Sequence, residues 1–148
     1  MAKERSRQSP PRAGAWAIIY CAATDKFLFG KRSAVVSNSG AWNFFGGRID
    51  RGEGPCSALR RELAEETGLR IKSKRLSKLS WIAKPGKGKR ACGRELHYYL
   101  LTVDREVVPR LNHEHSGFGW FKRNSLPARF NRPTTLAIRR GLLKTIKL

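Results

Sequence analysis

A chain of 148 residues with 40% hydrophobic residues is long enough to bury a sizeable core and too apolar to be disordered. Its 31 Lys and Arg against 11 Asp and Glu give a formal net charge of +20, which favours anionic partners. No apolar run approaches the roughly 20 residues that cross a bilayer, and we expect neither a membrane span nor a signal peptide. Three scattered cysteines predict free thiols and a cytoplasmic protein.

The first residues are polar, basic and proline-containing. We expect residues 1–13 to form a disordered tail and residues 14–148 to form a single domain. Two apolar segments, Ala15–Ala22 and Lys26–Arg32, flank a Thr-Asp pair and predict a β-hairpin. Trp42–Phe45 is expected to be a short strand that leads into the next segment.

The segment Gly47–Leu69, GRIDRGEGPCSALRRELAEETGL, holds five of the 11 acidic residues. A basic chain that gathers its carboxylates at one place is expected to build a divalent-cation site. Glu62, Glu65 and Glu66 lie at i, i+3 and i+4, so a helix places them on roughly one face, where like charges repel. Carboxylate oxygens are the preferred ligands of Mg²⁺ and Mn²⁺, and a bound cation would remove this repulsion.

The same segment carries the signals of a loop, a helix and a loop. Glycines before the helix allow close backbone approach, and Pro55 suits the first helical position because its missing N–H costs nothing there. Ala58, Leu59 and Leu63 form an apolar stripe. Gly68 is suited to end the helix.

This pattern resembles the Nudix box, the signature of the MutT-like Nudix hydrolases. The box reads Gly, five residues, Glu, seven residues, Arg-Glu, a bulky apolar residue, any residue, Glu-Glu, any residue, Gly and a bulky apolar residue. Its nine specified positions are filled here by Gly47, Glu53, Arg61, Glu62, Leu63, Glu65, Glu66, Gly68 and Leu69. Many family members have Pro before the two glycines, where Phe45 stands in this chain.

The resemblance implies an α/β fold, an α/β/α sandwich with a mixed sheet in which the box helix lies against the sheet. It also implies attack of water on a diphosphate linkage, with Mg²⁺ or Mn²⁺ as cofactor. The expected ligands are Glu62 and Glu66, with Glu65 close by. The Gly46 carbonyl is an additional candidate, and Glu53 is a candidate for a second ion or a water.

Two further roles follow from the resemblance. Arg61 is assigned to the catalytic set as a residue that braces the box loop, through a salt bridge to Glu53. The basic residues around the box, Lys31, Arg32 and Arg48, are expected to bind the substrate.

The general base has two kinds of candidate. In some Nudix enzymes it is a glutamate of the box, here Glu62 or Glu65, and in others a glutamate of a later loop. Glu114, between His113 and His115, is the later candidate. The alternative for this tripeptide is a solvated polar loop.

The rest of the chain predicts further strands and a terminal helix. The predicted strands are Leu69–Ile71, Leu76–Ala83, Glu95–Val103 and Phe118–Phe121. Residues 84–90, KPGKGKR, are predicted to form a basic loop. Pro133–Ile146 is predicted to be a helix with its cap near Asn131 or Arg132.

Basic residues also gather outside the box. Residues 70–94 hold ten Lys and Arg and residues 122–148 hold eight, and neither range contains an acid. Such a surface promotes salt-dependent binding of RNA, and the alternative is a generally basic surface without a specific partner. Trp81, Tyr98 and Tyr99 are candidates for base stacking, although aromatic residues in strands are more often core.

Three functions are consistent with these features. The leading one is hydrolysis of a nucleoside diphosphate derivative: a nucleotide sugar, ADP-ribose, a dinucleoside polyphosphate or a noncanonical NTP. The second is an RNA 5′-end pyrophosphohydrolase or decapping enzyme that uses the basic surface. The third is a non-catalytic nucleotide- or RNA-binding Nudix module, against which the complete acidic set argues. The sequence predicts no particular oligomeric state.

Overall fold

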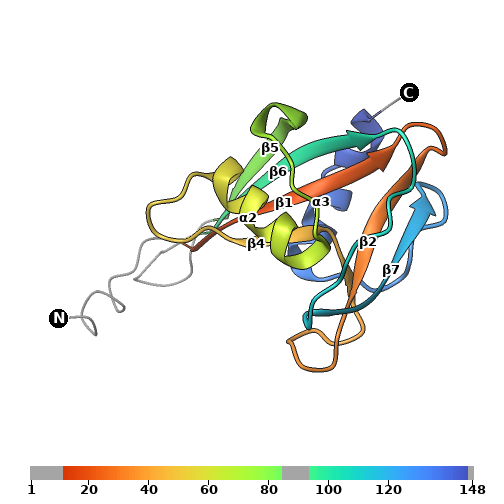
Figure 1. The fold of residues 1–148 in the computed structure, drawn as a ribbon, viewed down its shortest axis with the longest axis horizontal. Coiled ribbons are helices and arrows are strands. Elements are labelled where there is room, and N and C mark those ends of the chain that lie inside the picture. The colour runs from red at the N-terminus through yellow and green to blue at the C-terminus, as the bar shows by residue number, and fades with distance from the viewer. Residues whose placement is uncertain (1–11, 85–93, 147–148) are drawn as a thin grey trace.

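A computed structural model describes residues 12–84 and 94–146 (Figure 1). The strands are β1 (Arg12–Cys21), β2 (Lys26–Arg32), β3 (Trp42–Asn43), β4 (Phe45–Arg48), β5 (Leu76–Lys84), β6 (Arg94–Val103) and β7 (His115–Lys122). The helices are α2 (Pro55–Thr67) and α3 (Arg132–Arg139), with short 3-10 turns η1 (Ser73–Arg75) and η3 (Leu142–Thr145). The seven strands form one sheet.

The sheet is mixed, because β1 and β6 run parallel while the other pairs are antiparallel. One edge of β1 is paired with β6 along its whole length, and β2 and β4 share the other edge. β2 pairs with β1 only at Lys26–Leu28, and its Gly30 and Lys31 pair with β3 instead. The segment 42–48 therefore fills the opening between β1 and β2, which places β4 beside α2.

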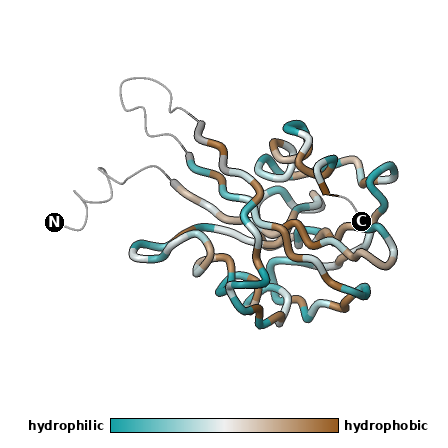
Figure 2. Tube along the Cα trace, turned by 90° about the horizontal axis from the view of Figure 1, so that it is seen from above, coloured by the Kyte–Doolittle hydropathy of each residue, from teal (hydrophilic) through white to brown (hydrophobic). Residues whose placement is uncertain are grey.

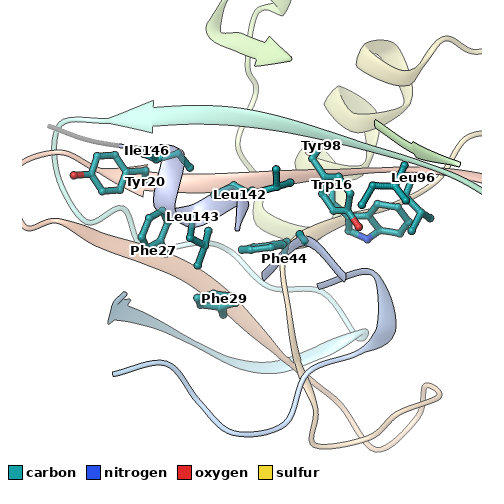
Figure 3. Packing of buried hydrophobic residues seen from close by; sticks show 13 residues of the cluster. Trp16, Tyr20, Phe27, Phe29, Phe44, Leu96, Tyr98, Leu142, Leu143 and Ile146 are labelled. Atoms are coloured by element: carbon teal, nitrogen blue, oxygen red, sulfur yellow. The ribbon is translucent and has the colours of Figure 1, made fainter. Parts of the chain in front are cut away.

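Both faces of the sheet are covered, and the alternation of residues along β1 explains why. One cluster, shown in Figure 3, joins the sheet to α3 and η3 and includes Trp16, Ile18, Tyr20, Phe27, Phe29, Phe44, Leu96, Tyr98, Leu142, Leu143 and Ile146. The second cluster joins the sheet to α2 and includes Ala15, Ala17, Ile19, Leu28, Phe45, Leu59, Leu63, Tyr99 and Leu101. The predicted α/β/α sandwich with a mixed sheet is confirmed.

Hydropathy follows these layers. In Figure 2, apolar stretches run through the middle of the molecule, and many of the outer turns are hydrophilic. Tyr98 and Tyr99 are buried in the two clusters, so they are core residues rather than exposed stacking platforms. Among the described residues, no helix combines the length and the apolar character needed to cross a membrane.

Two predicted elements are corrected. Leu69–Ile71 forms no strand, because its backbone is bonded by side chains: Thr67 Oγ1 accepts from the Leu69 N–H, and Arg60 Nε donates to the Ile71 carbonyl. The predicted terminal helix is divided, because Gly141 adopts a left-handed φ of 75° between α3 and η3. The turn lets Leu142 and Leu143 reach the core.

Two ends also differ from the prediction. β1 begins at Arg12, so residues 12 and 13 belong to the sheet, while the rest of the predicted tail lies outside the described residues. The KPGKGKR loop falls outside them as well, apart from the last residue of β5. Asn131 caps α3 as expected, since its side chain accepts from the Thr134 N–H.

Gly46 is the glycine on which the β1–β4 contact depends. Its φ is +146°, and an added Cβ would lie 2.1 Å from the Ala15 carbonyl oxygen and 2.6 Å from the Trp16 Cα. We predict that Gly46→Ala lowers the free energy of unfolding by at least about 2 kcal/mol, measured by chemical denaturation. Gly117→Ala is the control, because no atom lies within 4 Å of its added Cβ. Wild-type stability in Gly46→Ala would contradict the prediction.

Candidate active site

Helix α2 presents two of the box glutamates, Glu62 and Glu66, to the sheet. Gly54 precedes the helix in an extended conformation, Pro55 occupies its first turn, and Gly68 ends it with a left-handed φ of 75°. Leu59 and Leu63 bury one face of the helix against β1 and β4. This packing holds the neighbouring face, with its glutamates, against β4.

Three carboxylates converge beside β4. Glu62, Glu66 and Glu114 each offer an oxygen, and these oxygens all lie within 4.8 Å of one another. Glu66 is only 2% exposed, and its Oε1 accepts from the Gly46 N–H at 3.1 Å. Burial raises the pKa of Glu66 well above its ordinary value and also raises the pKa of Glu62.

This donor set fits a hard divalent cation. Mg²⁺ and Mn²⁺ are bound by carboxylate oxygens, and the cluster supplies three carboxylates at one point of the molecule. A buried carboxylate that contacts one backbone donor and other carboxyl groups is poorly compensated in the protein alone. A cation among the three side chains would supply the missing compensation.

Arg61 forms the salt bridge to Glu53 that the sequence predicts. Its Nε and one terminal nitrogen contact the two carboxylate oxygens of Glu53 at 2.8 and 2.9 Å, and the other terminal nitrogen lies 3.0 Å from Glu62 Oε1. Arg61 also donates to the Arg48 carbonyl at 3.1 Å. The guanidinium lowers the pKa of Glu53 to about 2. Arg61 therefore links the box loop, α2 and β4.

A cavity of about 390 Å³ opens beside the carboxylates. Its lining residues are Trp16, Arg32, Ser37, Asn38, Asn43, Gly46, Gly47, Arg48, Glu62, Glu66, Glu114, Asn131, Arg132 and Pro133. Acidic and basic side chains thus share one cavity. This composition suits a polyphosphate that is held by a cation at one point and by arginines at others.

The predicted site residues separate into two groups. Glu62, Glu66 and Glu114 meet at the cavity, and Gly46, Arg32 and Arg48 line it. Arg61 contacts this group through Glu62 and Arg48, whereas Glu65, Glu53 and Lys31 do not line the cavity. Glu65 has a side chain that is 54% exposed and lies 3.4 Å from Arg61, while Glu53 is engaged by Arg61. Lys31 lies over the Trp42 ring, 6.0 Å from its centre. Roles for these three residues in ligation or substrate binding stay predictions.

Asn43 is a cavity residue that the sequence argument missed. Its side chain is buried, and its Nδ2 donates to the Phe44 carbonyl at 2.6 Å and lies 3.2 Å from His115 Nε2. Its Oδ1 has no hydrogen-bond partner among the described residues. Burial lowers the pKa of His115 to about 4, so this histidine is neutral at pH 7. The sequence feature that could have identified Asn43 is its position as a polar residue within a short apolar strand directly before the box.

Solved structures of related enzymes share this fold. A MutT NUDIX hydrolase from Burkholderia pseudomallei is 25% identical, with a TM-score of 0.71 and coverage of 94% of this chain and 100% of that chain. The E. coli dihydroneopterin triphosphate pyrophosphohydrolase is 16% identical, with a TM-score of 0.69 and coverage of 92% and 99%. A bifunctional NMN adenylyltransferase/ADP ribose pyrophosphatase from Francisella tularensis, complexed with AMP and a Mn ion, is 20% identical, with a TM-score of 0.65 and coverage of 96% and 45%.

The family assignment rests on the sequence match as well as on the fold. The NUDIX domain family model matches residues 10–142, and the chain belongs to the Nudix family. No curated protein sequence matches it significantly. The protein is a Nudix pyrophosphohydrolase, as the box predicts.

The brace can be tested by Arg61→Lys, which keeps the charge but loses the planar fork. We predict a lower melting temperature and a lower kcat, because a lysine cannot contact both oxygens of Glu53 while also reaching Glu62. Arg51→Lys, at an exposed position of the box loop that forms no ion pair within the described residues, is the control and should match the wild type in both measurements. Unchanged stability and kcat in Arg61→Lys would show that the fork is dispensable.

Proposed function

We propose that this protein hydrolyses a diphosphate linkage in a nucleoside diphosphate derivative and uses Mg²⁺ or Mn²⁺ to do so. The observation that carries the proposal is the convergence of Glu62, Glu66 and Glu114 at one end of an arginine-containing cavity. The substrate classes are nucleotide sugars, ADP-ribose, dinucleoside polyphosphates and noncanonical NTPs. Two proteins with this fold are named as enzymes of this kind: a bifunctional NMN adenylyltransferase/ADP ribose pyrophosphatase, whose name includes one of these substrates, and a dihydroneopterin triphosphate pyrophosphohydrolase.

Each residue of the cavity has a separate role in the proposed reaction. Glu62 and Glu66 would hold the cation, which would neutralise phosphate oxygens and lower the pKa of the attacking water. Glu114 accepts the proton of that water, because its carboxylate adjoins the other two but comes from a separate segment. Arg32 and Arg48 line the same cavity and pair with the phosphates.

Recognition of the rest of the substrate involves Asn43. A buried acceptor without a partner is costly unless a ligand supplies a donor, and Asn43 lines the cavity with its Oδ1 unpaired among the described residues. We therefore assign Asn43 to substrate binding through a donor group of the nucleoside. We also propose a cytoplasmic location, in keeping with free thiols at Cys21 and Cys56.

A hydrolysis screen tests the proposal as a whole. The purified protein would be incubated with Mg²⁺ or Mn²⁺ and one member of each substrate class, together with triphosphorylated RNA. We expect one of the small-molecule classes to be cleaved at a diphosphate linkage. Failure to cleave any of them with either metal would contradict the proposal.

The acidic cluster makes a specific prediction. Activity should require millimolar Mg²⁺ or Mn²⁺, and Glu62→Gln and Glu66→Gln should each lower kcat by about 10²-fold or more, since each removes a charge that stabilises the transition state. Glu65→Gln is the matched control on the same helix, and it should lose less than about tenfold because its side chain lies outside the cluster.

Thermal melting separates this effect from unfolding. In metal-free protein, Glu66→Gln should melt at or above the wild-type temperature, since the amide is neutral without taking up a proton, removes the repulsion with Glu62 and Glu114, and keeps an acceptor for the Gly46 N–H. Full activity in excess EDTA after removal of bound metal would contradict the metal requirement.

Glu114 carries the prediction for the base. Glu114→Gln should lower kcat by about 10² to 10⁴ while the affinity for Mn²⁺, measured by calorimetry, stays close to that of the wild type. Glu106→Gln, in the segment before Glu114, is the control and should retain wild-type kcat. A loss of Mn²⁺ affinity in Glu114→Gln would make Glu114 a ligand, and a wild-type kcat would return the base to the box.

A second candidate function, cleavage at RNA 5′ ends, is favoured by one basic groove. A cavity of about 480 Å³ along the outer side of α2 is lined by Arg60, Arg70 and Lys72, together with Arg61. The first three form no ion pair within the described residues. Cations without acidic partners beside the active-site helix are suited to the phosphates of a longer chain.

Neutralising this groove decides between the two substrates. If RNA is the substrate, changing Arg60, Arg70 and Lys72 together to Gln should raise KM for RNA. It should also reduce the slope of log affinity against log salt concentration by about 0.7 for each RNA phosphate that the groove no longer neutralises. Turnover of a small nucleotide should hardly change. The control neutralises three exposed cations of the α3 layer: Arg139, Arg140 and Lys144. Equal effects of both triple variants on RNA would show only a general charge effect.

A further inference from the structure

Glu114 differs from the other carboxylates because no helix holds it. It is the last residue before β7, whereas Glu62 and Glu66 are carried by α2. At this end of β7 the pairing with β2 is irregular: Lys31 pairs with Gly117 and Arg32 with His115, so Ser116 is an extra residue. A β-bulge of this kind redirects the neighbouring side chains. The position of Glu114 therefore depends on what holds the backbone just before the bulge.

Ser33, at the end of β2, supplies two of these contacts. Its N–H donates to the carbonyl of Glu114 at 2.9 Å, and its Oγ donates to the carbonyl of His113 at 2.6 Å. On the other side, Asn112 Oδ1 accepts from the Glu114 N–H at 3.0 Å. Both peptide groups of Glu114 are thus held by hydrogen bonds. We infer that Ser33 is a positioning residue that sets Glu114 against the cluster of Glu62 and Glu66.

The same serine connects Glu114 to the substrate cavity. Ser33 follows Arg32, which lines the cavity and whose Nε donates to the Ser37 carbonyl at 2.6 Å. The loop that Ser33 begins is closed by hydrogen bonds from the Arg32 N–H to Ala41 and from the Gly40 N–H to Arg32. A substrate phosphate that contacts Arg32 would therefore bind to the residue next to Ser33, which holds the backbone of Glu114. The inference rests on the proposed role of Glu114 as the base.

The test uses Ser33→Ala, Ser33→Thr, Glu114→Gln and the double variant Ser33→Ala/Glu114→Gln. Ser33→Ala removes the bond to His113 and should lower kcat about tenfold, because small displacements of a catalytic group cost up to about 10² in rate. KM should change less than threefold, and Ser33→Thr should recover wild-type kcat because it retains the hydroxyl. In the Glu114→Gln background, Ser33→Ala should have no further effect. Ser125→Ala, at an exposed serine after β7, is the control.

Hydrogen–deuterium exchange gives a readout that is independent of activity. The peptide spanning residues 112–116 should exchange faster in Ser33→Ala than in the wild type, and Ser33→Thr should restore its protection, while α2 is unchanged. Wild-type kcat or unchanged exchange in Ser33→Ala, beside an impaired Glu114→Gln, would overturn the inference alone. An additive loss in the double variant would do the same. Wild-type kcat in Glu114→Gln would overturn both the inference and the assignment of the base.

Discussion

The buried carboxylate of Glu66 is the constraint to which the rest of the site responds. Removing an ionised group from water is expensive unless hydrogen bonds or an opposite charge compensate it, and among the described residues Glu66 is bonded by the Gly46 N–H and by another carboxyl group, that of Glu62. Glu62 and Glu114 lie nearby and add repulsion. The stability of α2 against the sheet must offset this cost in the metal-free protein. Strain that the fold tolerates at one point is typical of a site prepared for a ligand.

Arg61 reduces the repulsion among the other carboxylates of the box. It contacts Glu53, Glu62 and Glu65 and lies 3.3 Å from Asp50, so four of the five box acids share one cation. Glu66 is the exception, and it is also the most buried of the box acids. Within the described residues, the contacts of Arg61 therefore leave one box carboxylate, that of Glu66, without a cationic side chain beside it. The chain has a net charge of +20, and Glu66 is nevertheless the box acid that Arg61 does not contact.

The parts that could be predicted from the sequence are those set by short-range spacing. The positions of Pro55 and Gly68 bound α2 correctly, and the i, i+4 relation of Glu62 and Glu66 places them on one face. The hairpin strand β2 and the partner strand β6 follow from alternating apolar residues in the same way. In each case the interactions that decide the structure lie within a few residues of one another.

The features that could not be predicted from residue spacing depend on contacts between residues far apart in the chain. Leu69–Ile71 has an apolar pattern suited to a strand, but side chains from α2 bond its backbone groups instead. The terminal helix ends at Arg139 because a left-handed turn at Gly141 brings Leu142 to the core. Asn43 becomes a cavity residue only when β3 enters the opening between β1 and β2.

Glu114 lies between these two cases, since the family resemblance singles it out but only the β2–β7 pairing brings it to the cluster. The site thus consists of one part carried by a packed helix and another part carried by loops. Two carboxylates sit on a helix packed against the sheet, while the third and the cavity-lining Ser37 and Asn38 sit on connections at the ends of β2 and β7. Connections tolerate change in sequence far better than packed helices do. Changes in these loops can therefore alter which substrate is bound without moving the carboxylates on α2. The position of Glu114 relative to Glu62 and Glu66, for which we infer that Ser33 is responsible, can change in the same way.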